Sequence, residues 1–131
     1  MPLLFLEGCE NRMSEQRRRL TKEERLEVLK KTDFRCAYCG MELGFDSFQV
    51  DHVVPLRSGG KDEISNMLPA CRSCNHYKRG NSLEGWRKIL EAMPETLHRD
   101  CYTYRQAVKF GLVEPHPQPV VFYFVKESVP I

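Results

Sequence analysis

The sequence has no long hydrophobic run. No stretch approaches the roughly 18 apolar residues that a membrane-spanning helix needs. The apolar run Leu3–Leu6 is too short for the core of a signal peptide, and no positively charged segment precedes it. We therefore expect a protein with no membrane partner and a cytoplasmic location.

The sequence also lacks internal repeats and low-complexity segments, and its length leaves no room for a second catalytic domain. Single hydrophobic cores usually span roughly 100 to 200 residues, and the chain has 131. Hydrophobic residues make up 41% and charged residues 29%, which is ordinary for a globular protein. We expect one folded domain.

Two CxxC pairs account for four of the six cysteines. They are Cys36 with Cys39 and Cys71 with Cys74, and without a secretion signal they predict a metal site instead of disulfides. Four thiolates are a tetrahedral ligand set for Zn²⁺ and leave no position for water. We therefore expect a structural zinc, with two disulfides or buried free thiols as the alternative.

The chain has no strong excess of charge of either sign. Its formal net charge is +2 with every cysteine neutral. A zinc ion on four thiolates would add 4 − 2 = 2 negative charges and bring the protein near zero. Overall charge therefore says little about nucleic acid, and local clusters must decide. Cys9 and Cys101 have no assigned role.

The N-terminal part predicts a flexible arm followed by a helix. Residues 1–20 turn from apolar to basic, and the run Arg17–Arg19 is either a nucleic-acid contact or an ordinary solvated face. Thr21 and Glu24 have the spacing of a capping box, which predicts a helix over 22–31.

The middle of the chain predicts a strand, a loop, a second strand and a helix. Residues 45–50 alternate loosely as a strand does, with 51–52 at its end. Pro55 and two glycines make 55–60 a loop. A second, antiparallel strand is expected at 67–68, and a helix over 72–78.

The C-terminal part predicts two amphipathic helices. Apolar residues recur at helical spacing from Leu83 to Met93, with Ser82 as the N-cap and Trp86 in the core, and we expect this helix to end at Pro94. A second helix should run from about 95 to Gly111. Residues 115–119 then form a proline-rich linker into 120–125, which has the composition of a strand or docking tail.

Residues 35–80 resemble the HNH endonucleases of the ββα-metal type, in the subgroup with a four-cysteine zinc site. The stretch VDHVVP is also similar to the nuclease domain of Cas9 enzymes, and the whole segment is similar to small stand-alone phage or bacterial members. The residues that carry the resemblance are Cys36, Cys39, Gly40, Asp51, His52, Pro55, Gly59, Gly60, Asn66, Cys71, Cys74, Asn75 and Lys78.

The resemblance implies an α+β protein. Its core would be a ββα-metal (His-Me finger) unit with the zinc, flanked by an N-terminal helix, C-terminal amphipathic helices and a short terminal strand. The nuclease domain would cover 21–114 with its core motif at 36–80, followed by the linker and tail at 115–131. The host would be a bacterial or phage-infected cell.

The resemblance also implies roles for individual residues. His52 would activate water, since imidazole has a pKa of about 6.5, and Asn66 would orient the imidazole of His52. Asp51 and Asn75 would hold a catalytic divalent cation, Mg²⁺ or Mn²⁺, through hard oxygen atoms. Asn75 follows Cys74, so the zinc would position it. His76 is the rival ligand to Asn75.

Basic residues gather after the second cysteine pair, and only Glu84 opposes them between residues 72 and 88. Such side chains neutralise phosphates without reading base sequence. The residues expected to contact nucleic acid are Arg72, Lys78, Arg79, Arg87 and Lys88.

The expected function is that of a metal-dependent DNA endonuclease or nickase. It would act on double-stranded DNA with low sequence specificity and, as the resemblance implies, leave 5′-phosphate and 3′-hydroxyl ends. The alternatives are a non-catalytic, zinc-stabilised nucleic-acid-binding module and a protein-interaction domain.

Overall fold

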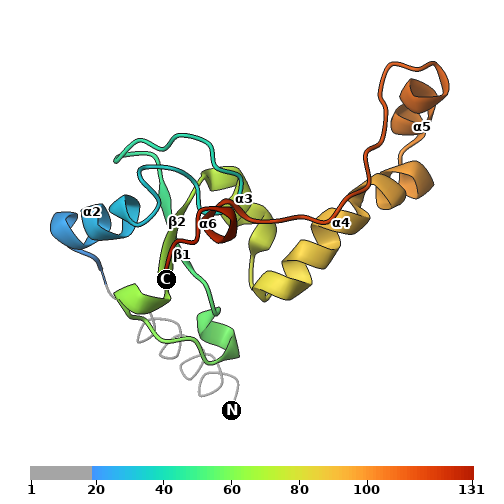
Figure 1. Cartoon of the computed structure of the whole chain (residues 1–131). Helices are drawn as coiled ribbons and strands as arrows, with labels where there is room; N and C mark the ends of the chain where they lie inside the picture. Colours follow the sequence, from blue (N-terminus) through green and yellow to red (C-terminus); the bar gives the residue numbers. More distant parts are fainter. Residues whose placement is uncertain (1–18) are drawn as a thin grey trace, which may run out of the picture. The chain divides into compact units, whose positions relative to one another are not determined.

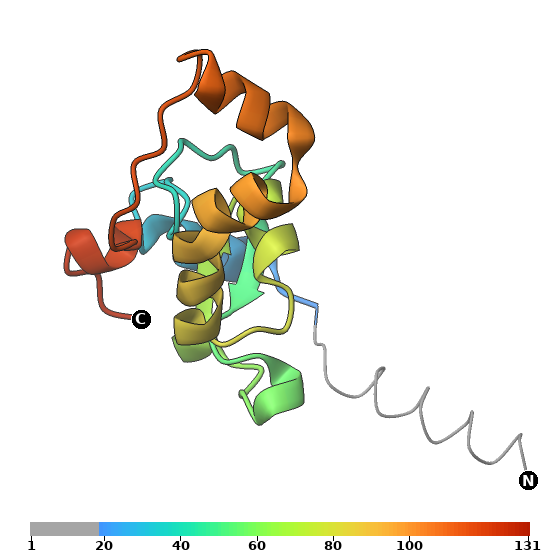
Figure 2. The ribbon, with the colours of Figure 1, turned by 90° about the vertical axis from the view of Figure 1, so that its right-hand side faces the viewer.

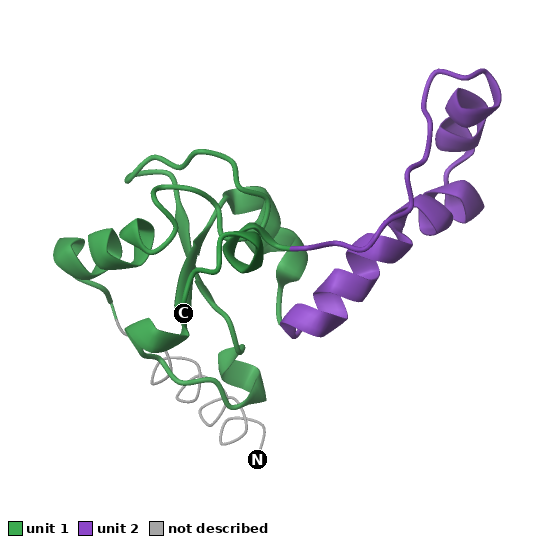
Figure 3. Ribbon diagram, in the orientation of Figure 1, with its two compact units in different colours: residues 1–80, 122–131 green, residues 81–121 purple. Residues whose placement is uncertain are grey.

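The computed structural model describes residues 19–131 (Figure 1). The predicted arm, including Arg17 and Arg18, therefore lies almost wholly outside the described residues. The described chain forms two compact units, one made of 19–80 with 122–131 and the other of 81–121 (Figure 3). Two strands and several helices make this an α+β protein, as predicted.

The first unit is built on an antiparallel pair of strands, β1 (Gln49–His52) and β2 (Met67–Ala70), followed by helix α3 (Arg72–Lys78). In the register, Asp51 lies opposite Leu68 and His52 opposite Met67. The sheet contacts α3 through β1 (Figure 1). The predicted strand, strand and helix order of the ββα core is confirmed.

Helix α2 (Lys22–Lys30) covers the other strand and supplies much of the core. The capping box is present: Glu24 N–H donates to the Thr21 hydroxyl, and Thr21 N–H donates to the Glu24 carboxylate, each at 3.1 Å. Val28 and Leu29 are fully buried and cluster with Phe48 and Met67. The predicted helix is therefore confirmed to within one residue.

The first strand begins later than predicted, because residues 45–47 form a turn. The guanidinium of Arg25 donates to the carbonyls of Phe45 and Phe48 at 3.1 and 3.3 Å and lies 4.2 Å from the Phe48 ring centroid. Both phenylalanines pack in the same core. In a strand, Phe45 and Phe48 would point to opposite faces, because they are three residues apart.

The loop between the strands contains two short 3₁₀ helices, η1 (Leu56–Ser58) and η2 (Ile64–Asn66). A Cβ atom at Gly60 would lie 1.8 Å from the Val54 carbonyl oxygen, so only glycine fits this close approach of two backbone segments. The loop therefore folds back on the end of β1, beside Asp51 and His52.

The second unit consists of helices α4 (Leu83–Asp100) and α5 (Tyr102–Lys109), and the chain turns between them (Figure 2). Ser82 caps α4, as predicted. The prediction that Pro94 ends the helix is wrong, because α4 continues to Asp100 with Pro94 inside it. No helix of the described residues is both long and apolar enough to cross a membrane.

The expected terminal strand is also wrong. Residues Tyr123–Lys126 form a short helix, α6, and its first two residues dock on the loop of the first cysteine pair. The backbone N–H groups of Tyr123 and Phe124 donate to the carbonyls of Tyr38 and Ala37 at 3.1 and 2.8 Å. The apolar run therefore docks as a tail on the loop that carries Cys36 and Cys39. A helical turn is sufficient to pack its aromatic side chains against this loop.

Candidate active site

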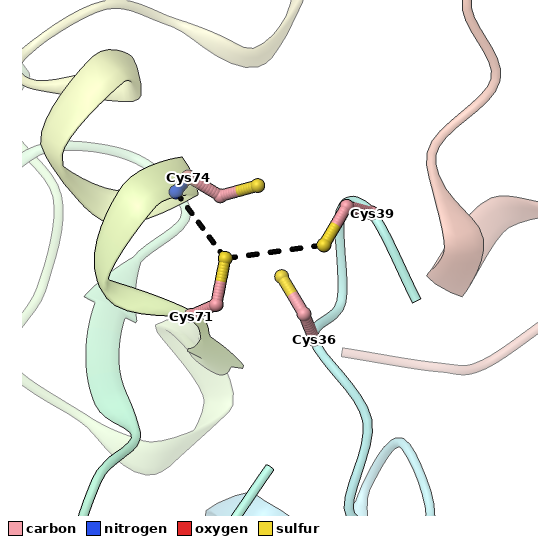
Figure 4. Close-up of side chains that lie close together, drawn as sticks. All are labelled: Cys36, Cys39, Cys71 and Cys74. Atoms are coloured by element: carbon pink, nitrogen blue, oxygen red, sulfur yellow. Dashed lines mark hydrogen bonds between the residues drawn. The ribbon is translucent and has the colours of Figure 1, made fainter. Parts of the chain in front are cut away.

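The four cysteines of the CxxC pairs come together as the sequence predicts. Cys36 and Cys39 lie on a loop, while Cys71 and Cys74 lie at the start of α3, and the sulfur atoms point toward one another (Figure 4). All four lie within 4.8 Å of one another, and none forms a disulfide. The Sγ atoms of Cys39 and Cys71 are 3.9 Å apart.

This geometry fits a zinc ion. With Zn–S bonds of about 2.3 Å, the edge of a tetrahedron of sulfur atoms is about 3.8 Å long. The neighbouring thiol of Cys74 lowers the pKa of Cys36 to about 4, and Cys36 in turn raises the pKa of Cys74, because the two share one proton. Close thiols that already favour one thiolate are the donor set that Zn²⁺ takes.

The end of the strand pair opens into a cavity of about 630 Å³. Asp51, His52 and Asn75 all line it, so three of the four predicted catalytic residues face one space. His76 is exposed, is not among the lining residues, and places its ring against Tyr77 with centroids 5.5 Å apart. The full lining is Leu20, Gln49, Val50, Asp51, His52, Pro55, Leu56, Arg57, Asp62, Met67, Asn75, Arg79 and Gly80.

The imidazole of His52 is held by a carboxylate that the sequence did not single out. Its Nε2 lies 2.9 Å from Oδ1 of Asp62, and each side chain is about four-fifths buried. A carboxylate accepts, so Nε2 carries the proton and donates it. In the neutral ring, Nδ1 then keeps the lone pair.

Asn66 stabilises the loop and makes no side-chain hydrogen bond to the imidazole. Its amide group donates to the carbonyls of Val54 and Lys61 and accepts from Val54 N–H, all at 2.9 Å. Lys61 precedes Asp62, so Asn66 fixes the segment that carries the partner of His52. Its predicted effect on the orientation of His52 is therefore indirect.

Asp51 lies on the buried side of β1 and is 5% exposed. The hydroxyl of Tyr38 donates to its Oδ2, and the ammonium of Lys78 donates to its Oδ1 at 3.2 Å. Burial raises the pKa of Asp51, and these two partners oppose that rise by stabilising the carboxylate. Burial likewise raises the pKa of Tyr38, so its hydroxyl stays protonated.

The placement of Lys78 contradicts its predicted contact with nucleic acid. Its side chain is fully buried, and its Nζ also donates to the His52 carbonyl at 3.0 Å. A buried ammonium that balances an internal carboxylate does not reach a phosphate at the surface. Lys78 instead links α3 to the end of β1.

The other predicted basic contacts divide into two groups. Arg72 and Arg79 are exposed in the first unit, and Arg79 lines the cavity together with Arg57. In the second unit, Lys88 is exposed, whereas Arg87 is paired with Glu84 and Glu91 at 2.5 and 2.6 Å. The sequence indicates Glu84 as an opposing charge. It does not indicate the ion pair of Arg87 with Glu91, which lies one helical turn beyond Arg87.

The site contains Tyr38, Arg57 and Asp62, which sequence reasoning missed. Asp62 and Arg57 lie in the loop that Gly60 folds back, and no periodicity marks them as neighbours of His52. Tyr38 lies in the loop from Cys36 to Cys39, here called the cysteine knuckle. Its position in the sequence indicates only that it belongs to this loop. The only signal for Asp62 in the sequence is that it is an acidic residue close after Gly59 and Gly60.

Comparison with known proteins agrees with this geometry. Residues 36–80 match the family model described as HNH endonuclease. This segment is an HNH endonuclease domain. It contains all four cysteines, both strands and α3.

Individual proteins similar to this chain include CRISPR-associated endonuclease Cas9 of Actinomyces naeslundii, 32% identical over 63 residues, which cover 47% of this chain and 6% of that protein. Cas9 of Corynebacterium diphtheriae is 28% identical over 83 residues, covering 56% of this chain and 8% of that protein. The SPbeta prophage-derived putative HNH endonuclease YoqL of Bacillus subtilis is 32% identical over 66 residues, covering 40% of this chain and 26% of that protein.

The crystal structure of the type II-C Cas9 enzyme from Actinomyces naeslundii is also similar, with a TM-score of 0.49 and 23% identity over 68% of this chain and 11% of that one. The chain thus spans less than a tenth of the length of the Cas9 relatives and about a quarter of the prophage protein.

Proposed function

We propose that the protein is a metal-dependent endonuclease or nickase that hydrolyses phosphodiester bonds in double-stranded DNA. The observation that carries the proposal is the cavity that His52, Asp51 and Asn75 all line within the segment that matches the HNH endonuclease family model. A protein that only binds nucleic acid needs no such combination of a general base and oxygen ligands for a metal ion.

His52 acts as the general base. Asp62 accepts a hydrogen bond from Nε2–H, so the proton stays on Nε2 and the lone pair of Nδ1 can take a proton from a water molecule. The water oxygen attacks phosphorus and the bond from phosphorus to the 3′ oxygen breaks. The 3′ oxygen takes a proton from solvent water, so the products carry a 5′-phosphate and a 3′-hydroxyl. Asn66 contributes by fixing the loop from which Asp62 reaches His52.

Asp51 and Asn75 hold the catalytic divalent cation, Mg²⁺ or Mn²⁺. Both line the cavity and both offer oxygen atoms, the ligands that these hard cations prefer, and Mg²⁺ needs few protein ligands because it keeps several waters. When bound, the cation supplies positive charge that stabilises the phosphorane-like transition state. His76, the rival ligand, is exposed and is not among the residues that line this cavity.

The cysteines serve a separate, structural role. Four thiolates fill the tetrahedral shell of a Zn²⁺ ion, so Cys36, Cys39, Cys71 and Cys74 have no place for a reacting water. Because Asn75 directly follows Cys74 in α3, the zinc fixes the helix turn that carries Asn75.

The substrate is DNA, and its recognition is mainly electrostatic. Arg57 and Arg79 line the cavity, and Arg72 is exposed on the same unit. Contacts of arginine with phosphate oxygens give affinity without base readout, which favours low sequence specificity. The cellular location that accompanies this function is the cytoplasm of a bacterial or phage-infected cell.

Cleavage of supercoiled plasmid tests the proposal. We expect the zinc-loaded protein to relax the plasmid with Mg²⁺ or Mn²⁺, and to be inactive with chelator. His52→Ala should lower the rate by about 10²- to 10⁴-fold, the usual contribution of a general base. His116→Ala, which removes an exposed histidine of the second unit, is the matched control.

Relaxed product indicates a nick in one strand, and linear product indicates cleavage of both. DNA binding without metal-dependent cleavage, or full cleavage by His52→Ala, would contradict the enzyme and favour a zinc-stabilised nucleic-acid-binding module.

A further inference from the structure

Tyr38 connects the zinc site to the predicted ligand of the catalytic cation. It lies between Cys36 and Cys39, and its side chain is almost fully buried. Its hydroxyl donates to Oδ2 of Asp51, although the two residues are 13 positions apart in sequence. The cysteine knuckle therefore contributes a hydrogen bond to a carboxylate in the cavity.

The tail of the chain packs on the ring of Tyr38. The rings of Phe122 and Phe124 meet it edge to face, with centroids 5.3 and 6.1 Å away, and both phenylalanines are buried. The Tyr38 carbonyl accepts from Tyr123 N–H at 3.1 Å. Tyr38 is thus fixed on its backbone and on its ring, so its hydroxyl has little freedom of direction.

We infer that Tyr38 is a positioning residue for Asp51: it holds the carboxylate so that one oxygen atom is presented to a divalent cation. The inference rests on the proposed function, in which Asp51 is a ligand of that cation. A carboxylate that binds metal needs its other lone pairs oriented by outer partners. The zinc knuckle and the C-terminal tail then act on the catalytic site through one phenol.

The Lys78 ammonium has a different role at the same carboxylate. It neutralises the charge of Asp51 and contacts both carboxylate oxygens, at 3.2 and 3.1 Å, so it stabilises the carboxylate without selecting one oxygen. The Tyr38 hydroxyl donates to Oδ2, which fixes the rotation of the group. Removing the hydroxyl therefore loosens the geometry while the charge balance stays.

The test measures Mn²⁺ binding to zinc-loaded protein by electron paramagnetic resonance, in the absence of DNA. Tyr38→Phe keeps the ring and its contacts with Phe122 and Phe124 but loses the hydroxyl. We expect the dissociation constant for Mn²⁺ to rise about 10- to 100-fold, the usual effect of losing such a partner. Tyr77→Phe, which removes an exposed hydroxyl on α3, should bind as the wild type does.

Asp51→Asn separates the inference from the function on which it rests. If it binds Mn²⁺ as tightly as the wild type, Asp51 is not a ligand, and both the proposed metal site and the inference are overturned. If Asp51→Asn loses Mn²⁺ but Tyr38→Phe binds normally, only the inference is overturned. Equal zinc content in all variants excludes a collapse of the knuckle.

If Tyr38→Phe loses zinc or unfolds, the wild type still decides the question. The ¹³Cζ resonance of Tyr38, assigned through its contacts with the Phe122 and Phe124 rings, reports the strength of the hydroxyl hydrogen bond. We expect it to move when Mg²⁺ is added to the wild type and to stay fixed in Asp51→Asn. A resonance that does not move in the wild type overturns the inference.

Discussion

Asn75 and His76 are neighbours in sequence, yet they differ in what they face. A helix turns about 100° per residue, so consecutive side chains of α3 point in different directions. Asn75 lines the cavity with Asp51 and His52, whereas His76 is exposed against Tyr77. At the scale of the residue, the rotation of one helix favours Asn75 over His76 as the ligand.

Asn75→Ala should therefore lower metal-dependent cleavage on the order of 100-fold or more, because it removes a proposed ligand of the catalytic cation. His76→Ala should change the rate by about twofold at most. Plasmid cleavage at saturating Mg²⁺ measures both. Zinc content must match the wild type in each variant, since Asn75 adjoins Cys74, and a reversed order of the two rates would make His76 the ligand.

Two arginines that look alike in the sequence have different electrostatic surroundings. Arg79 is exposed at the cavity, while Arg87 is paired with Glu84 and Glu91. For Arg79→Ala, the slope of log affinity for duplex DNA against log salt should become shallower by about 0.9, the loss of one phosphate contact. Arg87→Ala should change the slope much less, because its charge is already neutralised.

Fluorescence anisotropy with labelled duplex DNA, at several salt concentrations and without divalent cation, measures these slopes. The same loss of slope in Arg87→Ala as in Arg79→Ala would show that the carboxylates of Glu84 and Glu91 release the guanidinium to DNA. An unchanged slope in Arg79→Ala would place the phosphate contacts away from the cavity.

At the scale of the element, α4 shows how a helix continues through a proline. Pro94 has no N–H group to donate to the carbonyl of Leu90, and its ring crowds that turn. The helix nevertheless runs for 18 residues, from its Ser82 cap to Asp100. One lost hydrogen bond is outweighed by the remaining bonds and by the apolar side of the helix.

Pro94→Ala should therefore stabilise the second unit, by up to about 3 kcal/mol, since the substitution restores a donor and a strong helix former. Thermal unfolding followed by circular dichroism at 222 nm measures the change. Glu95→Ala serves as a control for alanine substitution in the same turn. A lower unfolding temperature for Pro94→Ala would mean that the proline sets a bend on which this unit depends.

The C-terminal segment illustrates the opposite effect of context on an element. Val120–Val125 has the composition of a strand, but it pairs with no strand among residues 19–131. Its backbone bonds to Ala37 and Tyr38 instead, and α6 forms at Tyr123–Lys126. Aromatic packing against the cysteine knuckle, and not β-propensity, decides this conformation.

At the scale of the whole molecule, the cluster of four cysteines joins parts of the first unit that are far apart in sequence. It ties the loop at 36–39 to the start of α3 at 71–74, and the tail at 122–124 docks on that loop. The second unit, 81–121, contains none of these four cysteines. A zinc ion bound there would therefore stabilise the first unit and leave the second to its own packing.

We expect one zinc per chain, and we expect its removal to unfold the first unit, because structural zinc contributes roughly 10–16 kcal/mol of apparent binding free energy in small domains. Hydrogen exchange with a strong chelator should show lost protection in β1, β2 and α3, with protection retained in α4. Added Zn²⁺ should restore it. Native protein with two disulfides and no zinc would contradict the assignment.

Most of the local structure was predictable from the sequence, because its signals are local. The capping box gives α2, the CxxC spacing gives the metal site, and the order Asp51, His52, Asn66 and Asn75 gives the HNH core. The two errors have different causes: α4 tolerates the one hydrogen bond lost at Pro94, whereas the C-terminal segment depends on contacts with Ala37 and Tyr38 far away in the chain.

Tertiary structure alone decided which side chains meet at the catalytic site. Periodicity places a residue on a face of its own element, but it does not tell which residue of a distant loop will oppose it. Gly60 folds the loop so that Asp62 reaches His52, and the knuckle brings Tyr38 to Asp51. Lys78 is basic in any reading of the sequence, and only burial against Asp51 shows that its charge serves the interior.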